Sequence, residues 1–345
     1  MRNFFADKRV LIFGHTSYRG AWLSLVLSKL GADVFGISAE SPARKSLFTE
    51  IDVEQLIRSE IVDYRNYVSF NQVIDNFDPQ IIVFISPTSS FFNHSDIKNL
   101  YSLNTLGILN TLDYFRHSES GRIFVNLIPG LSPGMMSREL KTENSGEIEL
   151  IRGSFVSAAY LTKGYRLAYE DDEKLYLNLN SSEVMGGGDW SGLSLVNELS
   201  KLIFKRNDII EIVNNETHKI VHILDLINGL LQIIKDYYTD NTINSKDISL
   251  FPGESHILSE QNICDIFKKS FDYIKIISDT KEPVLSNSQL FTNSMNFSEF
   301  VNWKPVISVE DSINLCVEWE NAWNRGADMQ RFTLNQISDY LNKNG

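Results

Sequence analysis

The feature that most constrains this chain is a glycine loop between an apolar segment and a helical segment near the N-terminus. Residues 10–13 form a short apolar run of the kind found in strands buried on both faces of a sheet. The run leads into residues 14–20 (GHTSYRG), and residues 21–30 then carry apolar side chains at helical spacing. In this order the three segments form a dinucleotide-binding unit, because N–H groups at the helix N-terminus can approach a pyrophosphate.

Apolar runs and helical stretches alternate through the first half of the chain. Further strands are expected at residues 34–37, in a segment ending near Asp63, and at 81–85 and 123–125, with a long helix over 97–115. This alternation implies right-handed crossovers and an α/β fold with a parallel, doubly wound sheet of the Rossmann type. The pattern loosens after about residue 185. We therefore expect a Rossmann dinucleotide-binding domain over 1–185 and a smaller C-terminal substrate lobe over 186–345, with some chain returning to the sheet.

The charge balance argues against nucleic acid as a partner. The net charge is −12, so there is no basic excess to neutralise phosphates, although a small anionic ligand needs only a locally positive pocket. The N-terminus lacks the long apolar region and the cleavage site of a signal peptide. No apolar run reaches membrane-spanning length. A cytoplasmic protein without a membrane partner is expected.

The candidate cofactor site starts at the glycine loop. Glu40 follows the second expected strand, where an acid can accept the adenosine ribose hydroxyl; a solvated loop glutamate is the alternative. Asp63, at the end of the third strand, could face an adenine amino group. The loop residues proposed to contact the cofactor are Gly14, Thr16, Ser17, Tyr18, Arg19 and Gly20. NAD or NADP is the cofactor that this arrangement predicts.

Metal and thiol chemistry are not expected. The histidines are scattered, and no pair has metal-ligand spacing beside a cysteine or carboxylate cluster. The two cysteines, Cys264 and Cys316, lie in apolar stretches and predict two core thiols, with a disulfide as the alternative.

A series of short motifs runs along the chain. It starts with residues 14–27 (GHTSYRGAWLSLVL) and continues at 46–48 (SLF), 101–104 (YSLN) and 184–190 (VMGGGDW). It ends with Trp319, Ala322, Trp323, Arg325, Gly326, Asp328, Met329 and residues 337–340 (ISDY). In order and rough spacing the series resembles the CDP-glucose 4,6-dehydratases of the extended short-chain dehydrogenase/reductase superfamily. The resemblance implies the fold, a nucleotide-sugar ligand and a role in bacterial surface-glycan biosynthesis.

The resemblance also implies a reaction. NAD takes hydride from C4 of the sugar, water leaves across C5 and C6, and hydride returns to C6. The base is a tyrosine, assisted by a lysine one helical turn later. Lys163 matches that lysine, but Ala159 stands four residues before it. Tyr160, three residues before Lys163, is either a displaced base or a packed aromatic residue.

The segment after the fifth strand departs further from the family. It reads Ile128, Pro129, Gly130 and Leu131 where the family has a hydroxyl, an acid and a lysine. None of these four side chains can transfer a proton. Dehydration by the family's route is therefore not expected.

The substrate side carries similar changes. The candidate substrate-binding residues are Glu183, Gly188, Asp189, Trp190 and Lys219. Glu183 falls on an asparagine of the family, and a glutamate about 4 Å from a diphosphate costs about 1–4 kcal/mol. Two of the family's arginines fall near Ser194 and Val213, which removes bidentate donors for a pyrophosphate.

The cofactor side is less altered. Ser17 replaces a loop glycine, and its Cβ is expected to crowd the pyrophosphate. Ser86 and Pro87 occupy a turn that usually has small residues, and proline removes one backbone donor there. Asn104 matches an asparagine that shapes the active site in the superfamily; helix packing is the alternative.

Three functions follow from these patterns. The first is a diverged relative of the dehydratases that binds a nucleotide or sugar nucleotide without dehydrating it. The second is an active nucleotide-sugar enzyme that uses Tyr160, Lys163 or Glu183 in new roles. The third is a structural subunit that pairs with an active paralogue. The superfamily implies a homodimer formed through two helices per subunit, one of them the Lys163 helix.

Overall fold

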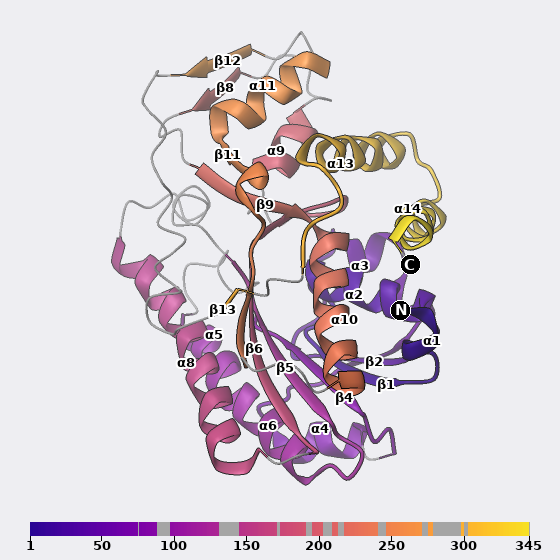
Figure 1. Ribbon diagram of the computed structural model, residues 1–345, viewed down its shortest axis with the longest axis vertical. Coiled ribbons are helices and arrows are strands. Elements are labelled where there is room, and N and C mark those ends of the chain that lie inside the picture. Colours follow the sequence, from indigo (N-terminus) through magenta and orange to yellow (C-terminus); the bar gives the residue numbers. More distant parts are fainter. Residues whose placement is uncertain are drawn as a thin grey trace.

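The core of the molecule is a parallel sheet (Figure 1). The computed structural model describes residues 1–74, 76–87, 97–130, 145–170, 173–190, 195–202, 209–212, 217–240, 246–270, 275–278, 298–299 and 303–344. In this part of the chain the main sheet has eight strands in the order β13-β10-β6-β5-β4-β1-β2-β3. They are β1 (Arg9–Phe13), β2 (Asp33–Ser38), β3 (Arg58–Ile61), β4 (Ile81–Ile85), β5 (Ile123–Ile128), β6 (Leu175–Ser181), β10 (Asp247–Leu250) and β13 (Ser298–Glu299). All neighbouring pairs are parallel, which confirms the predicted doubly wound fold.

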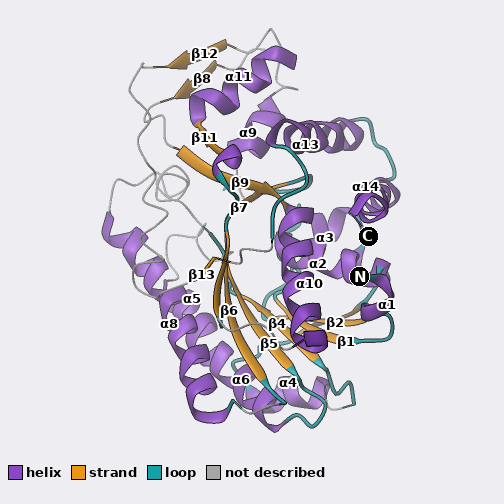
Figure 2. Ribbon diagram, viewed as in Figure 1, coloured by secondary structure: helices purple, strands orange, loops and turns teal. Residues whose placement is uncertain are grey.

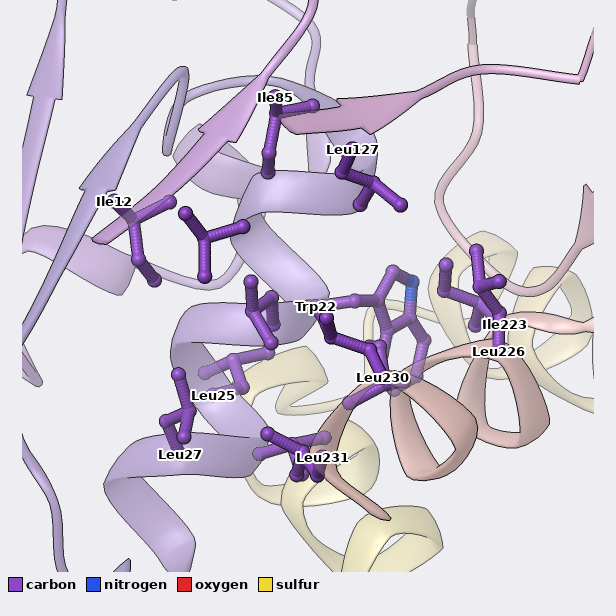
Figure 3. Close-up of a cluster of buried hydrophobic side chains, with 14 of the residues drawn as sticks. Ile12, Trp22, Leu25, Leu27, Ile85, Leu127, Ile223, Leu226, Leu230 and Leu231 are labelled. Carbon is purple, nitrogen blue, oxygen red and sulfur yellow. The ribbon is translucent and has the colours of Figure 1, made fainter. Parts of the chain in front are cut away.

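Helices cover both faces of this sheet (Figure 2). Successive strand residues point to opposite faces, so Val10 and Ile12 join one core cluster and Leu11 and Phe13 the other. The first cluster is closed by α2 (Tyr18–Lys29), α10 (Ile223–Asp240) and α14 (Met329–Asn344). The second is closed by α4 (Tyr67–Ile74), α6 (Ile108–His117) and α8 (Ser145–Tyr169). Figure 3 shows Trp22 of α2 packed among Ile223, Leu226 and Leu230 of α10.

The helix expected over residues 97–115 has a wider turn in its middle. It consists of α5 (Ile97–Ser102), a π-helical segment (Leu103–Gly107) and α6. The other short helical segments are α1 (Arg2–Phe5), α3 (Leu47–Glu50) and the 3₁₀ turns Val53–Gln55 and Glu254–His256. Single π turns inside α-helices are frequent at functional sites. This one contains Asn104, whose side chain contacts the Pro87 carbonyl just after the carboxyl end of β4.

A second group of elements packs at the end of the main sheet. Its three-stranded sheet contains β7 (Glu183–Met185), β9 (Thr217–His222) and β11 (Ile257–Ser259), and β8 (Ile209–Ile212) pairs with β12 (Lys275–Ser278). The helices here are α9 (Leu195–Leu202), α11 (Glu260–Ser270) and α13 (Val309–Asn324). Their shared core contains Cys264 and Cys316, which are buried free thiols as predicted. Because β10 and β13 lie in the main sheet, a division at residue 185 stays a proposal.

A chain of buried polar groups crosses the main sheet. Ser86 donates to Asn126 (3.1 Å), Asn126 to Asn178 (3.0 Å), and Asn178 to the carboxylate of Asp247 (2.8 Å). Arg166 of α8 closes the chain with two hydrogen bonds to that carboxylate, of 3.2 and 2.6 Å. The network ties α8 to the floor of the site through β5, β6 and β10.

Candidate functional site

A cleft of about 540 Å³ opens beyond the carboxyl ends of β1, β2 and β4. The N-terminal turn of α2 forms one wall, and the segment from β7 to Trp190 forms part of another. Ligands of open α/β sheets bind at this edge. Of the predicted site residues, the cleft is lined by Gly14, Thr16, Ser17, Tyr18, Arg19, Glu40, Ser86, Glu183, Gly188, Asp189 and Trp190.

The glycine loop has the geometry that close approach of a phosphate requires. Gly14 has φ +87°, a left-handed conformation that favours glycine. A Cβ on Gly20 would lie 2.2 Å from the carbonyl oxygen of Gly14, so the loop and the first turn of α2 meet backbone to backbone. The residues present therefore fit a dinucleotide pyrophosphate at the N-terminus of α2.

Ser17 has a role that the sequence did not indicate. Its hydroxyl donates to the Gly14 carbonyl (2.7 Å) and accepts from the Gly20 N–H (3.1 Å), so it caps α2. The cap takes up the Gly20 N–H. A glycine at position 17 has no hydroxyl and would leave this N–H available to a phosphate. The predicted crowding of the pyrophosphate by this Cβ stays a prediction.

His15 anchors the glycine loop to the neighbouring strands β2 and β3. Its ring is fully buried, with Nδ1 2.9 Å from the Ser38 hydroxyl and Nε2 2.7 Å from the Ser59 hydroxyl. Burial lowers the pKa of His15 to about 4, so the ring is neutral at pH 7. Gly36 makes room for the ring, since a Cβ there would lie 2.2 Å from it. The loop is thereby held to β2 and β3.

Glu40 and Asp63, the two acids predicted on the adenosine side, are linked through Asn99 and Arg65. Glu40 lines the cleft, and its carboxylate accepts from the Asn99 amide at 2.7 Å. Arg65 donates to the Asn99 oxygen at 2.5 Å and forms a 2.7 Å ion pair with Asp63. The hydrogen bond from Arg65 holds the pKa of Asp63 below its usual range. Tyr64, rather than Asp63, lines the cleft at this point, and contact of Asp63 with adenine stays a prediction.

The predicted catalytic pair lies apart from the cleft lining. Tyr160 is 51% exposed, and neither it nor Lys163 lines the cleft. Ala159 is buried, as are Ala158 and Thr162 of the same helix, and its carbonyl accepts from the Asn178 amide at 2.9 Å. The structure therefore does not bring the two predicted catalytic residues to the cleft.

Asn104 is fully buried beside the cleft floor. Its amide donates to the Ser154 hydroxyl (3.3 Å) and the Pro87 carbonyl (3.4 Å). Its side-chain oxygen has no hydrogen-bond partner among the residues that the structure describes. Both predicted roles of Asn104, shaping the site and packing the helix, fit this position.

The β7 end of the cleft gathers charged groups. Arg19, Glu183 and Asp189 all line it. Burial lowers the pKa of Arg19, while the charges of Asp189, Tyr18 and Glu183 act in the opposite direction. Behind Glu183 lie His218 and Glu260, two residues that no sequence motif links to the site.

The remaining predicted residues either do not line the cleft or lie outside the described residues. Lys219 lies over the ring of Phe251 (5.3 Å) and does not line the cleft. Leu131, Ser194 and Val213 lie outside the described residues.

The C-terminal motif reaches the cleft through tryptophans. The Lys45 ammonium lies 4.0 Å from the ring centroid of Trp323 and 4.9 Å from that of Trp190. Trp323 also donates to Glu50 at 2.9 Å. A Cβ on Gly187, the middle glycine of residues 186–188, would lie 1.9 Å from the Trp319 ring, so this position has no room for a side chain. These contacts hold the wall of the cleft, although the motif itself is distant in sequence.

The part of the chain that the structure describes contains neither a metal-binding cluster nor a helix able to span a membrane. There, no group of three or more histidine, cysteine, aspartate or glutamate residues is arranged to hold a metal ion. Among the same residues, none of the helices combines the length and apolarity needed to cross a membrane.

Comparison with known proteins confirms the predicted resemblance. The chain is 24% identical to CDP-glucose 4,6-dehydratase of Salmonella typhimurium, over 99% of this chain and 98% of that protein. The fold matches UDP-glucose 4-epimerase from Thermotoga maritima (TM-score 0.66, 12% identity, 91% of this chain and 99% of that one). It also matches dTDP-glucose 4,6-dehydratase from Bacillus anthracis (TM-score 0.65, 13% identity, 93% and 99%). No protein-family model matches the chain.

Proposed function

We propose that the cleft binds NAD or NADP, with the pyrophosphate over the glycine loop. The observation that carries this is the backbone contact of Gly20 with Gly14 at the N-terminus of α2, inside a cleft at the carboxyl edge of the sheet. Glu40 would accept the ribose hydroxyl, held in place by Asn99. Structures of similar fold, the B. anthracis dehydratase and a UDP-glucuronic acid 4-epimerase from Bacillus cereus, are complexes with NAD.

We further propose that the protein is a diverged relative of nucleotide-sugar dehydratases that binds a nucleotide ligand but does not dehydrate by the tyrosine route. At the position of the expected base stands Ala159, which is 1% exposed. Gly130 lines the cleft beyond β5 and offers no acid, base or hydroxyl. No tyrosine stands four residues before Lys163, and Tyr160, three residues before it, does not line the cleft.

A second candidate is an active enzyme with altered chemistry. The observation in its favour is Glu183, a carboxylate that lines the cleft and contacts His218 at 2.8 Å. Turnover of CDP-glucose would favour this candidate and would contradict the first.

The test of the first candidate is calorimetric titration of the full chain with NAD, NADP and CDP-glucose. We expect NAD to bind with a roughly micromolar Kd, and NADP at least about tenfold more weakly, because its 2′-phosphate would meet the Glu40 carboxylate. Glu40→Gln should narrow that difference while leaving the fold intact. Binding of neither dinucleotide at millimolar concentration would contradict the proposal and favour a purely structural subunit.

We propose a homodimer through the outer face of α8. Tyr160 and Leu167 are seven residues apart on that helix and are 51% and 78% exposed. Leu106 is 45% exposed and lies in the π-helical segment before α6, which packs against α8. Tyr160 and Leu167 share one face of α8, and exposed apolar side chains on a common face indicate an interaction surface. An active paralogue using the same face is the alternative partner.

Sedimentation equilibrium checks the dimer. The full chain should be dimeric at micromolar concentration, and Leu167→Glu should shift it to monomer because a charge would be buried at the contact. Val306→Glu is the matched control, since Val306 is also exposed (55%) but lies beside α10, where its N–H donates to Asp225. A monomeric wild-type chain would refute this arrangement.

A further inference from the structure

The β7 end of the cleft has a charge balance that differs from that of a phosphate site. Among the residues that the structure describes, the charged side chains lining the cleft are two cations, Arg19 and Lys45, and three carboxylates, Glu40, Glu183 and Asp189. Lys45 lies against Trp190 and Trp323, in the segment after β2. The cation on the α2 side is Arg19, and the carboxylates of Asp189 and Glu183 both act on it. Among the described residues at this end of the lining, therefore, there are two carboxylates and one guanidinium.

Glu183 is held in place from behind. Its Oε2 lies 2.8 Å from Nδ1 of His218, and Nε2 of the same ring lies 3.4 Å from Oε1 of Glu260. All three side chains are buried, with exposures of 8%, 1% and 2%. β7 contributes Glu183, β9 contributes His218, and Glu260 is the first residue of α11. Glu183 and Glu260 contact opposite nitrogens of the His218 ring, which separates them. The two carboxylates therefore cannot bind the same metal ion.

The buried carboxylate of Glu183 limits which ligand groups can bind at this end of the cleft. A carboxylate in a protein interior attracts hydrogen-bond donors and repels anions more strongly than one in water, because the local dielectric is lower. Glu260 supplies a second negative charge behind the imidazole, so His218 does not turn this wall into a cationic one. Arg19 lines the cleft as well, and the charges of Asp189 and Glu183 offset part of its positive charge, although its Nε has no hydrogen-bond partner among the described residues.

We propose that Glu183 determines specificity at this end of the cleft. It takes a ligand group that donates hydrogen bonds and carries no negative charge, such as sugar hydroxyls or an ammonium group, and it disfavours a diphosphate. The inference rests on the proposed function in one respect, namely that the loop end of the same cleft holds the dinucleotide. The ligand class that follows is a neutral or cationic polyhydroxylated compound, distinct from a nucleoside diphosphate sugar.

The test is calorimetric titration of CDP-glucose into the full chain with NAD at saturating concentration. Glu183→Gln keeps the size of the side chain and its hydrogen bond to His218 but removes the charge. This variant should bind CDP-glucose at least about tenfold more tightly than wild type, with an unchanged Kd for NAD. Glu260→Gln is the matched control: it removes a charge from the same group of three residues on the side away from the cleft. It should change CDP-glucose binding less than Glu183→Gln does.

A second measurement needs no variant. Wild-type chain should bind CDP no more tightly than cytidine, because the added phosphates gain nothing at this end. CDP binding about tenfold tighter than cytidine would overturn the proposal, as would a Glu183→Gln variant that gains no affinity, including one that binds no CDP-glucose at all. The NAD titration alone reports on the dinucleotide site, so its failure would overturn the proposed function without deciding the role of Glu183.

Discussion

Replacing Asp247 by alanine is expected to lower the free energy of unfolding by about 3–5 kcal/mol. The Asp247 carboxylate receives two hydrogen bonds from Arg166 and one from Asn178, and the ion-paired side chains are only 15% and 8% exposed. Alanine would leave the Arg166 guanidinium buried without its counter-charge. The Asn178 amide would also lose an acceptor inside the sheet. Urea denaturation followed by circular dichroism measures the loss.

The control for this prediction is a neighbouring ion pair. Lys246 and Glu170 are 3.2 Å apart, and their side chains are 26% and 24% exposed. Glu170→Ala should therefore cost at most about 1 kcal/mol, because solvent screens the pair. Equal losses for the two variants would show that the Asp247 network contributes no more than an exposed ion pair.

Replacing Gly20 by alanine should damage both the fold and the proposed cofactor site. The new Cβ would lie 2.2 Å from the Gly14 carbonyl oxygen and 2.7 Å from Cα of His15, and backbone atoms cannot move aside by a change of rotamer. We expect a loss of about 3 kcal/mol, the upper end for overpacking, and loss of NAD binding as the loop shifts away from α2. Thermal unfolding and NAD titration measure the two effects.

Gly253→Ala is the matched control for Gly20→Ala. Gly253 has φ −66°, which any residue can adopt, and a Cβ there meets nothing within 4 Å. Its stability should be unchanged or higher by up to about 1 kcal/mol, because alanine restricts the unfolded chain. If the Gly20 variant bound NAD as wild type does, the loop would not be the pyrophosphate site.

Local sequence pattern was sufficient for the first unit of the fold. The apolar run of β1, the loop from Gly14 to Gly20 and the helical spacing of α2 are contiguous, so neighbouring residues alone specify the turn. The same pattern could not predict the role of Ser17, since a serine in that place can face a ligand or cap the helix. Only the position of its hydroxyl between Gly14 and Gly20 distinguishes the two.

The β7 end of the cleft required the tertiary structure. Glu183, His218 and Glu260 come from three elements that are far apart in the chain, and no spacing rule links them. The sequence indicated a glutamate in an unfavourable place for a diphosphate. The structure adds the histidine that holds it and the second carboxylate behind the ring.

Sequence alone therefore determined the parallel α/β architecture and the place of the dinucleotide loop, because both follow from hydrophobic period and local turn chemistry. It also predicts that Ala159 and residues 128–131 depart from the dehydratase pattern. Only the folded chain decided which charged groups meet across the cleft, and that Tyr160 lies on the outer side of α8. The physical reason is that contacts between distant segments depend on how strands and helices pack, and this information is not local to any motif.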